Sequence, residues 1–150
     1  MKDLRKLGRD RVRIWIWLVW MAIIVATSST VVHSREFVHG VVAKTPIRIS
    51  EGGFQAFWDS WWWLFVKGYH VLEFLLLFVL TWRAFPKLWL VWVATLCVLF
   101  AMSDEWHQTF VSDRGGRWSD VCIDGIGIGI GLVFSWSSQR RRGRGRLGSC

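Results

Sequence analysis

Acids, histidines and a lysine occur at helical spacing in three short stretches of the sequence. Lys67, His70 and Glu73 are three residues apart, and Asp120 and Asp124 are four apart, so each set lies along one side of a helix. A third set has the same spacings: Asp104, His107 and Gln108. Carboxylates and imidazoles that meet in one site can transfer protons, bind a divalent cation or orient a phosphate-binding group. Their function therefore depends on whether the chain brings the three sets together.

The composition indicates a membrane protein. Of the 150 residues, 53% are hydrophobic and 13 are tryptophan. The formal net charge is +8, but the basic residues gather near the two ends of the chain, so we expect no nucleic-acid partner. The three cysteines share no metal-like spacing, so we expect neither a disulfide framework nor a zinc site. No metal is assigned, and no cofactor is clearly implied.

Four apolar stretches predict an all-α integral membrane bundle of four transmembrane helices, over about residues 14–32, 61–82, 88–103 and 121–139. The first stretch carries no charge, the third is uncharged but short, and the second and fourth contain the polar residues described above. Residues 14–139 would form one transmembrane domain. Residues 1–13 are a basic segment before it, and residues 140–150 are predicted to be a disordered basic tail.

Basic residues predict the orientation of these helices in a cell membrane. Six lie before Ile14, two lie in the turn from Arg83 to Lys87, and five lie between Arg140 and Arg146. Positive charge is retained on the cytoplasmic side, so both termini should be cytoplasmic. The connections 33–60 and 104–120 should then face outward, and residues 50–63 could form a surface or re-entrant helix. All three polar sets consequently lie at the outer ends of their helices.

Glycines alternate with isoleucine and leucine in the fourth stretch, at positions 125, 127, 129 and 131. Small residues four apart allow two membrane helices to approach closely. A dinucleotide-binding loop is disfavoured, because no strand–turn–helix unit surrounds the glycines. The Gly125–Gly131 face is therefore predicted to pack against a neighbouring helix, and it could also form a homo-oligomer.

Two blocks of the sequence resemble the signature of the VanZ-like family, named for a teicoplanin-resistance accessory protein. The first is "KGYHVLEF", which begins at Lys67, and the second is "SDEWHQTF" followed by the pattern R.G...D...D..G...G from Arg114 to Gly131. The resemblance implies that the following polar positions form the site: Lys67, His70, Asp104, Glu105, His107, Gln108, Arg114, Asp120 and Asp124. This chain departs from the family at Asp124, where asparagine is common, and at Glu73, where an acid is unusual.

The resemblance implies low-level glycopeptide (teicoplanin) resistance, by binding or modifying an envelope component at an outward-facing polar site. The expected partner is a membrane lipid or a lipid-linked envelope precursor. Ligand-binding candidates are Lys67, His70, Gln108, Arg114, Asp120 and Asp124, and Arg114 could contact a phosphate through its planar guanidinium. The alternative is a membrane-embedded enzyme that acts on a phosphate-bearing lipid by acid–base or metal-assisted chemistry, with the catalytic candidates His70, Asp104, Glu105 and His107. A small proton-linked transporter is the third possibility.

Overall fold

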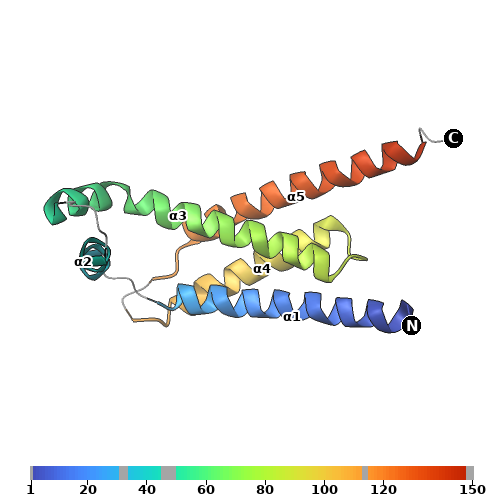
Figure 1. Cartoon of the computed structure of the whole chain (residues 1–150), viewed down its shortest axis with the longest axis horizontal. Helices are drawn as coiled ribbons and strands as arrows, with labels where there is room; N and C mark the ends of the chain where they lie inside the picture. Colours follow the sequence, from blue (N-terminus) through green and yellow to red (C-terminus); the bar gives the residue numbers. More distant parts are fainter. Residues whose placement is uncertain (1, 31–33, 45–49, 113–114, 148–150) are drawn as a thin grey trace.

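The computed structural model of the chain describes residues 2–30, 34–44, 50–112 and 115–147, and its secondary structure there is helical (Figure 1). The helices are α1 (Lys2–Ser28), α2 (Ser34–Lys44), α3 (Glu51–Ala84), α4 (Leu90–Gln108) and α5 (Trp118–Leu147). The prediction of an all-α fold is confirmed. Helices α1, α3, α4 and α5 form the bundle, whereas α2 is a short helix that contacts α3.

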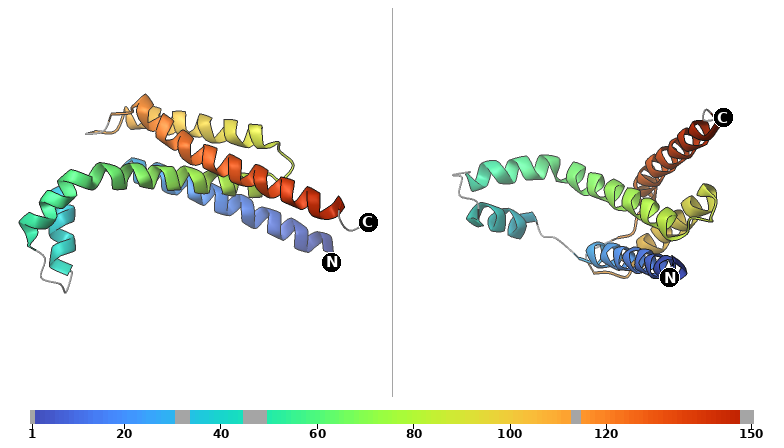
Figure 2. Two further views of the ribbon diagram at one scale, coloured as in Figure 1. Left: turned by 90° about the horizontal axis from the view of Figure 1, so that it is seen from above. Right: turned by 45° about the vertical axis from the view of Figure 1, so that its right-hand side comes forward.

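The beginning of α1 and the end of α5 lie at the same end of the bundle, together with the short connection between α3 and α4 (Figure 1). The connection between α4 and α5 lies toward the opposite end, as do α2 and the first part of α3. Figure 2 shows that α3 curves and that its first part extends beyond the other long helices. The three basic segments of the sequence therefore share one end of the bundle.

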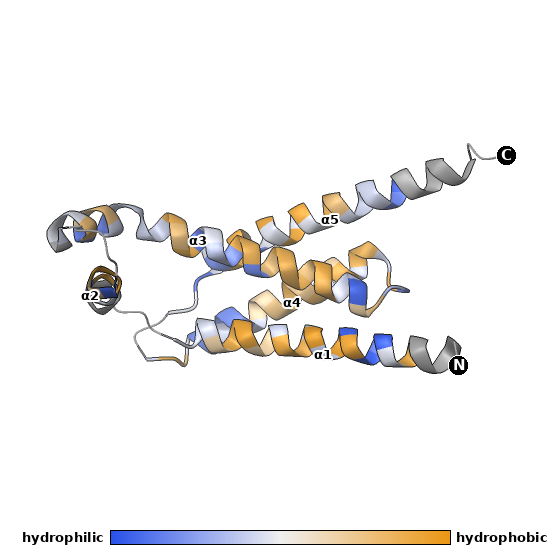
Figure 3. Cartoon of the chain, in the orientation of Figure 1, coloured by the Kyte–Doolittle hydropathy of each residue, from blue (hydrophilic) through white to orange (hydrophobic). Residues whose placement is uncertain are grey.

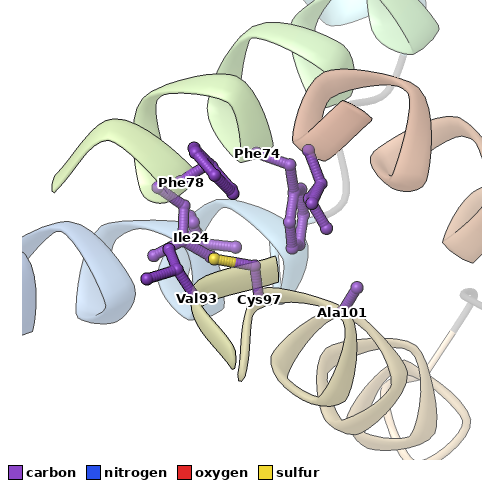
Figure 4. Close-up of a cluster of buried hydrophobic side chains, with 8 residues drawn as sticks. Ile24, Phe74, Phe78, Val93, Cys97 and Ala101 are labelled. Atoms are coloured by element: carbon purple, nitrogen blue, oxygen red, sulfur yellow. The ribbon is translucent and has the colours of Figure 1, made fainter. Parts of the chain in front are cut away.

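Apolar side chains from all four long helices meet in one core (Figure 4). Phe74 and Phe78 of α3 are fully buried and lie near Ile24 of α1, Val93 of α4 and Ile128 of α5. In lipid such contacts stabilise by van der Waals packing, because apolar surface gains little by leaving an apolar solvent. A hydrogen bond also joins α1 to α3, since the indole Nε1 of Trp17 donates to Thr81 Oγ1 across 2.9 Å.

The glycines of α5 allow it to lie directly on α3. A Cβ at Gly127 would overlap the carbonyl oxygen of Val71, and one at Gly131 would come within 2.7 Å of Phe78 Cδ1. Nothing lies within 4 Å of the corresponding positions at Gly125 and Gly129. The predicted close packing is therefore seen within the chain at Gly127 and Gly131. A homo-oligomer through the Gly125–Gly131 face would have to use Gly125 and Gly129.

Among the described residues, three helices are long and apolar enough to cross a membrane: Leu7–Ser28, Gly52–Ala84 and Trp118–Arg140. Within the described residues α4 does not reach the same hydropathy, because its last turns carry Asp104 and Glu105. The first of these spans ends before residue 32, which lies outside the described residues. The structure thus supports a multi-pass membrane protein, with three clear spans where four were predicted.

Helix α3 begins ten residues before the predicted start of its span at position 61. Its first residues had been assigned to a connection. Ser50 caps the helix, since its Oγ accepts a hydrogen bond from the Gly53 amide at 3.1 Å. Residues 51–63 accordingly continue into the span as one helix, and they are neither a separate surface helix nor a re-entrant helix.

Helix α5 continues to Leu147, into the segment 140–150 that the sequence predicts to be a disordered tail. An established helix adds residues without a new nucleation step, and arginine is a good helix former. The Arg140 guanidinium also lies 3.5 Å from the centroid of the Trp136 ring, a cation–π contact one turn apart. Residues 148–150 lie outside the described residues.

Candidate functional site

Two pairs of polar side chains join α3 to α5. Lys67 forms an ion pair with Asp120, and one turn deeper His70 Nδ1 lies 3.2 Å from Asp124 Oδ1. The pairs are in register because Lys67 and His70 are three apart on one helix and the two aspartates are four apart on the other. Lys67 and Asp120 remain partly exposed, whereas His70 is 9% and Asp124 only 1% exposed.

Asp124 is under-satisfied in the described part of the chain. Neither of its carboxylate oxygens accepts a hydrogen bond of normal geometry there, and its nearest polar neighbour is the imidazole of His70. A buried carboxylate needs hydrogen bonds or a cation, because burial removes it from water. The pairing favours a proton on Nδ1 of His70, facing Asp124, which makes Nε2 the nitrogen able to accept a proton.

A second polar network joins α1, α4 and the connection before α5. Asp104 Oδ1 accepts from Ser28 Oγ at 2.7 Å, and Asp104 Oδ2 accepts from Gln108 Nε2 at 3.1 Å. Gln108 Nε2 also donates to Glu105 Oε1 at 3.1 Å, and the Arg117 amide donates to Glu105 Oε2 at 2.8 Å. Every oxygen of these two buried carboxylates has a donor, so the network positions its own members.

Glu73 of α3 links the two α3–α5 pairs to the network around Asp104. It is 3% exposed, and its Oε1 accepts a hydrogen bond from Thr27 Oγ1 at 3.0 Å. Glu73 is one turn from His70 on α3, and the adjacent residues Thr27 and Ser28 of α1 donate hydrogen bonds to Glu73 and Asp104, so the acids of α3 and α4 lie close together. Apart from His107, the members of the three polar sets predicted from spacing therefore meet in one region, which we call the polar cluster. Its members are Lys67, His70, Glu73, Asp104, Glu105, Gln108, Asp120 and Asp124.

Two of the predicted site residues lie elsewhere. His107 is exposed, and its Nε2 lies 3.2 Å from Ser29 Oγ at the rim of the bundle, away from the buried acids. Arg114 lies outside the described residues. Arg117 is exposed and contributes its backbone amide to Glu105.

The contribution of α1 to the site was not predicted from the sequence. Thr27, Ser28 and Ser29 each contact an acid or a histidine on another helix. The available signal was the polar run "TSST" at residues 27–30, at the outer end of an otherwise apolar span. Polar residues there are typical of helix–helix hydrogen bonding.

The polar cluster holds more acids than bases among the described residues. Its acids are Glu73, Asp104, Glu105, Asp120 and Asp124, against Lys67 and an ionisable His70. Within the same residues no group of three or more His, Cys, Asp or Glu side chains has the geometry of a metal site. The buried acids instead bind hydroxyls, amides and the histidine.

Apolar helices surround this cluster and leave hydrophobic residues on their outer surfaces (Figure 3). The fold and the site together define a multi-pass helical membrane protein with ionisable groups buried near one end. The chain belongs to the VanZ/LLP1 family, whose family model matches residues 14–139. No curated protein and no solved structure matches the chain.

Proposed function

We propose that this protein acts at the outer face of a bacterial cell membrane, where it binds or modifies an envelope component at the polar cluster. The observation that carries the proposal is the buried His70–Asp124 pair beneath the partly exposed Lys67–Asp120 pair. Ionisable side chains at membrane depth are costly, so they commonly mark a functional site. Membership in the VanZ/LLP1 family supports low-level glycopeptide resistance, including teicoplanin resistance, as the cellular effect.

Helix α4 is the fourth transmembrane helix in this proposal. An odd number of spans would leave the beginning of α1 and the end of α5 on opposite sides of the membrane, yet they lie at one end of the bundle (Figure 1). The 19 residues of α4 cover nearly the hydrocarbon thickness. With the basic ends cytoplasmic, the polar cluster faces outward.

The proposed partner is a phosphate-bearing membrane lipid or a lipid-linked envelope precursor. Lys67 supplies a positive charge at the rim of the cluster, and Arg114 remains the predicted bidentate phosphate ligand. Asp104, Glu105 and Gln108 are held by their own hydrogen bonds, so they shape the site with little rearrangement. Binding is therefore the first candidate function.

A membrane-embedded enzyme is the second candidate, and the 3.2 Å contact between His70 Nδ1 and Asp124 Oδ1 favours it. A carboxylate that holds one imidazole nitrogen leaves the other as a general base. The acid–base group in this reading is His70, with Asp124 as its positioning residue. Proton-linked transport, the third prediction, would use the same buried groups as a relay.

The test is protection of a glycopeptide-sensitive bacterial host that expresses the protein. We expect wild type to raise the inhibitory concentration of teicoplanin and the His70→Ala variant to lose that effect. The control is His39→Ala on α2, which lies outside the cluster and is exposed. Membrane abundance is measured by immunoblot for each variant. Undiminished protection by His70→Ala at normal abundance would contradict the proposal.

A further inference from the structure

A pocket of about 510 Å³ lies between the last turns of α4 and the first turn of α5, beside the polar cluster. Met102 and Trp106 line it from α4, Thr109 lines it just after that helix, and Trp118 lines it from α5. Its volume is that of a typical small-molecule site. None of the four side chains that pair α3 with α5 lines the pocket, so the pocket could bind a molecule of its own.

The aromatic side chains indicate the depth of the pocket in the membrane. Trp106 is 68% and Trp118 is 74% exposed, and tryptophans at the ends of membrane helices prefer the interface between headgroups and hydrocarbon. Met102 lies one turn further toward the middle of α4. The pocket therefore opens where lipid chains meet their headgroups, and its apolar floor suits a hydrocarbon chain.

The charges of the pocket wall favour an anionic headgroup. Arg117 lines the pocket, is exposed, and forms no ion pair with any residue in the described part of the chain. Glu105 also lines the pocket, but its carboxylate is held by Gln108 and by the Arg117 amide. The Arg117 guanidinium can donate two hydrogen bonds to a phosphate, because it has no carboxylate partner in the described part of the chain.

The connection before α5 holds Arg117 in place. A Cβ at Gly116 would overlap the carbonyl oxygen of Glu105, so the connection packs directly on α4. Glu105 forms part of the pocket wall and part of the polar cluster at once. A molecule in the pocket would therefore lie beside the cluster.

We propose that this pocket holds a hydrocarbon chain of a membrane lipid whose phosphate headgroup contacts Arg117. The proposal rests on the proposed function, because it names the class of envelope component and the place of its chain. The lipid would enter sideways from the outer leaflet, and its headgroup would lie at Arg117, beside the polar cluster.

The experiment is photocrosslinking of the purified full-length protein in lipid nanodiscs. The probe is phosphatidic acid with a diazirine in one acyl chain, and the neutral comparison is the matching diacylglycerol. Ser103→Trp fills the pocket, because Ser103 lines it and donates only to the Phe100 carbonyl of its own helix. The matched control is Leu96→Trp, at an exposed site of α4 outside the pocket wall.

We expect crosslinks at Met102, Trp106 or Trp118 in the wild type and in Leu96→Trp, and their loss in Ser103→Trp. Arg117→Gln should lower labelling by phosphatidic acid roughly tenfold, the effect of losing one charge-assisted hydrogen bond, and leave diacylglycerol unchanged. Equal labelling of Ser103→Trp and Leu96→Trp, whether both high or both low, would contradict the proposal that the pocket binds the acyl chain. Equal labelling by the two wild-type probes would overturn the phosphate contact.

The result is distinguishable from a failure of the proposed function. His70 does not line the pocket, so His70→Ala should retain the crosslinks. If that variant also protects cells as well as the wild type, the function at the polar cluster is wrong while the lipid site stands.

Discussion

Ser28, at the end of the first helix, donates a hydrogen bond of 2.7 Å to Asp104, which lies 76 residues later on α4. Both side chains are buried, at 4% and 3% exposed. This contact connects α1 to a cluster that is otherwise built from the other three long helices. The first helix is thus a structural part of the site, in addition to being a membrane anchor.

Ser28→Ala should lower the stability of the protein by about 1–3 kcal/mol, because it leaves a buried acceptor of Asp104 without its donor. Thermal unfolding in detergent measures the loss as a lower midpoint. Ser103→Ala is the control, since that exposed hydroxyl bonds only its own helix. Equal midpoints for the two variants would show that the Ser28 contact contributes nothing.

The Lys67–Asp120 ion pair should contribute little stability. The two side chains are 33% and 19% exposed, and partly solvated pairs contribute under about 1 kcal/mol. A double-mutant cycle with Lys67→Met and Asp120→Asn should give a coupling free energy of that size, and added salt should reduce it. A coupling of several kcal/mol would mean that the pair is desolvated in the membrane. The Lys67→Met variant should nevertheless bind the proposed phosphate-bearing lipid more weakly, because it removes a positive charge at the rim of the polar cluster.

Asp124→Asn should raise the thermal midpoint at a pH where His70 is neutral, because it removes a buried charge that has neither a cation nor normal hydrogen bonds in the described part of the chain. It also separates the two leading functions. An asparagine fills the same space beside His70 and its amide can still hydrogen-bond a ligand, so a binding protein should keep most of its protection of cells. A general base loses the carboxylate that stabilises the protonated imidazole, so an enzyme loses activity. A lower midpoint at normal abundance would refute the argument about buried charge.

Gly127→Ala should prevent normal accumulation in the membrane. The added methyl would overlap the Val71 carbonyl and lie 2.9 Å from the Leu75 amide, and both are backbone atoms of a packed helix. Gly125→Ala has open space and should be neutral or stabilising by about 0.5–1 kcal/mol, the helix propensity difference. Immunoblots of membrane fractions compare the two. Similar low levels of both variants would point to a homo-oligomer through Gly125 and Gly129.

Cysteine accessibility tests the orientation. In a background without Cys122 and Cys150, Ser112→Cys should react with an impermeant maleimide in intact cells, and Ser138→Cys should react only after lysis. Ser112 follows α4 near the polar cluster, whereas Ser138 lies toward the basic end of α5. Labelling of position 138 from outside would reverse the topology and place the cluster in the cytoplasm.

Local patterns in the sequence predicted the four long helices, because each span is an apolar run whose length and backbone hydrogen bonding are set by the membrane. They did not predict α2, which lies in the predicted connection 33–60. The polar stripes were also visible, since residues three and four apart share a helix face in any environment. The ends of the helices were less predictable. Helix α3 is capped by Ser50 and begins ten residues before its predicted start, and α5 continues past its predicted end at residue 139 into the basic segment.

Only the tertiary structure decided which partners meet. Lys67 pairs with Asp120 and His70 with Asp124 because Gly127 lets α5 lie on the backbone of α3, which sets the register between the helices. Spacing gives the face of each residue, but it does not give the rotation and offset of one helix against another. For the same reason α1 had no predicted role, and its hydroxyls reach Glu73 and Asp104 only because the bundle places its outer end there.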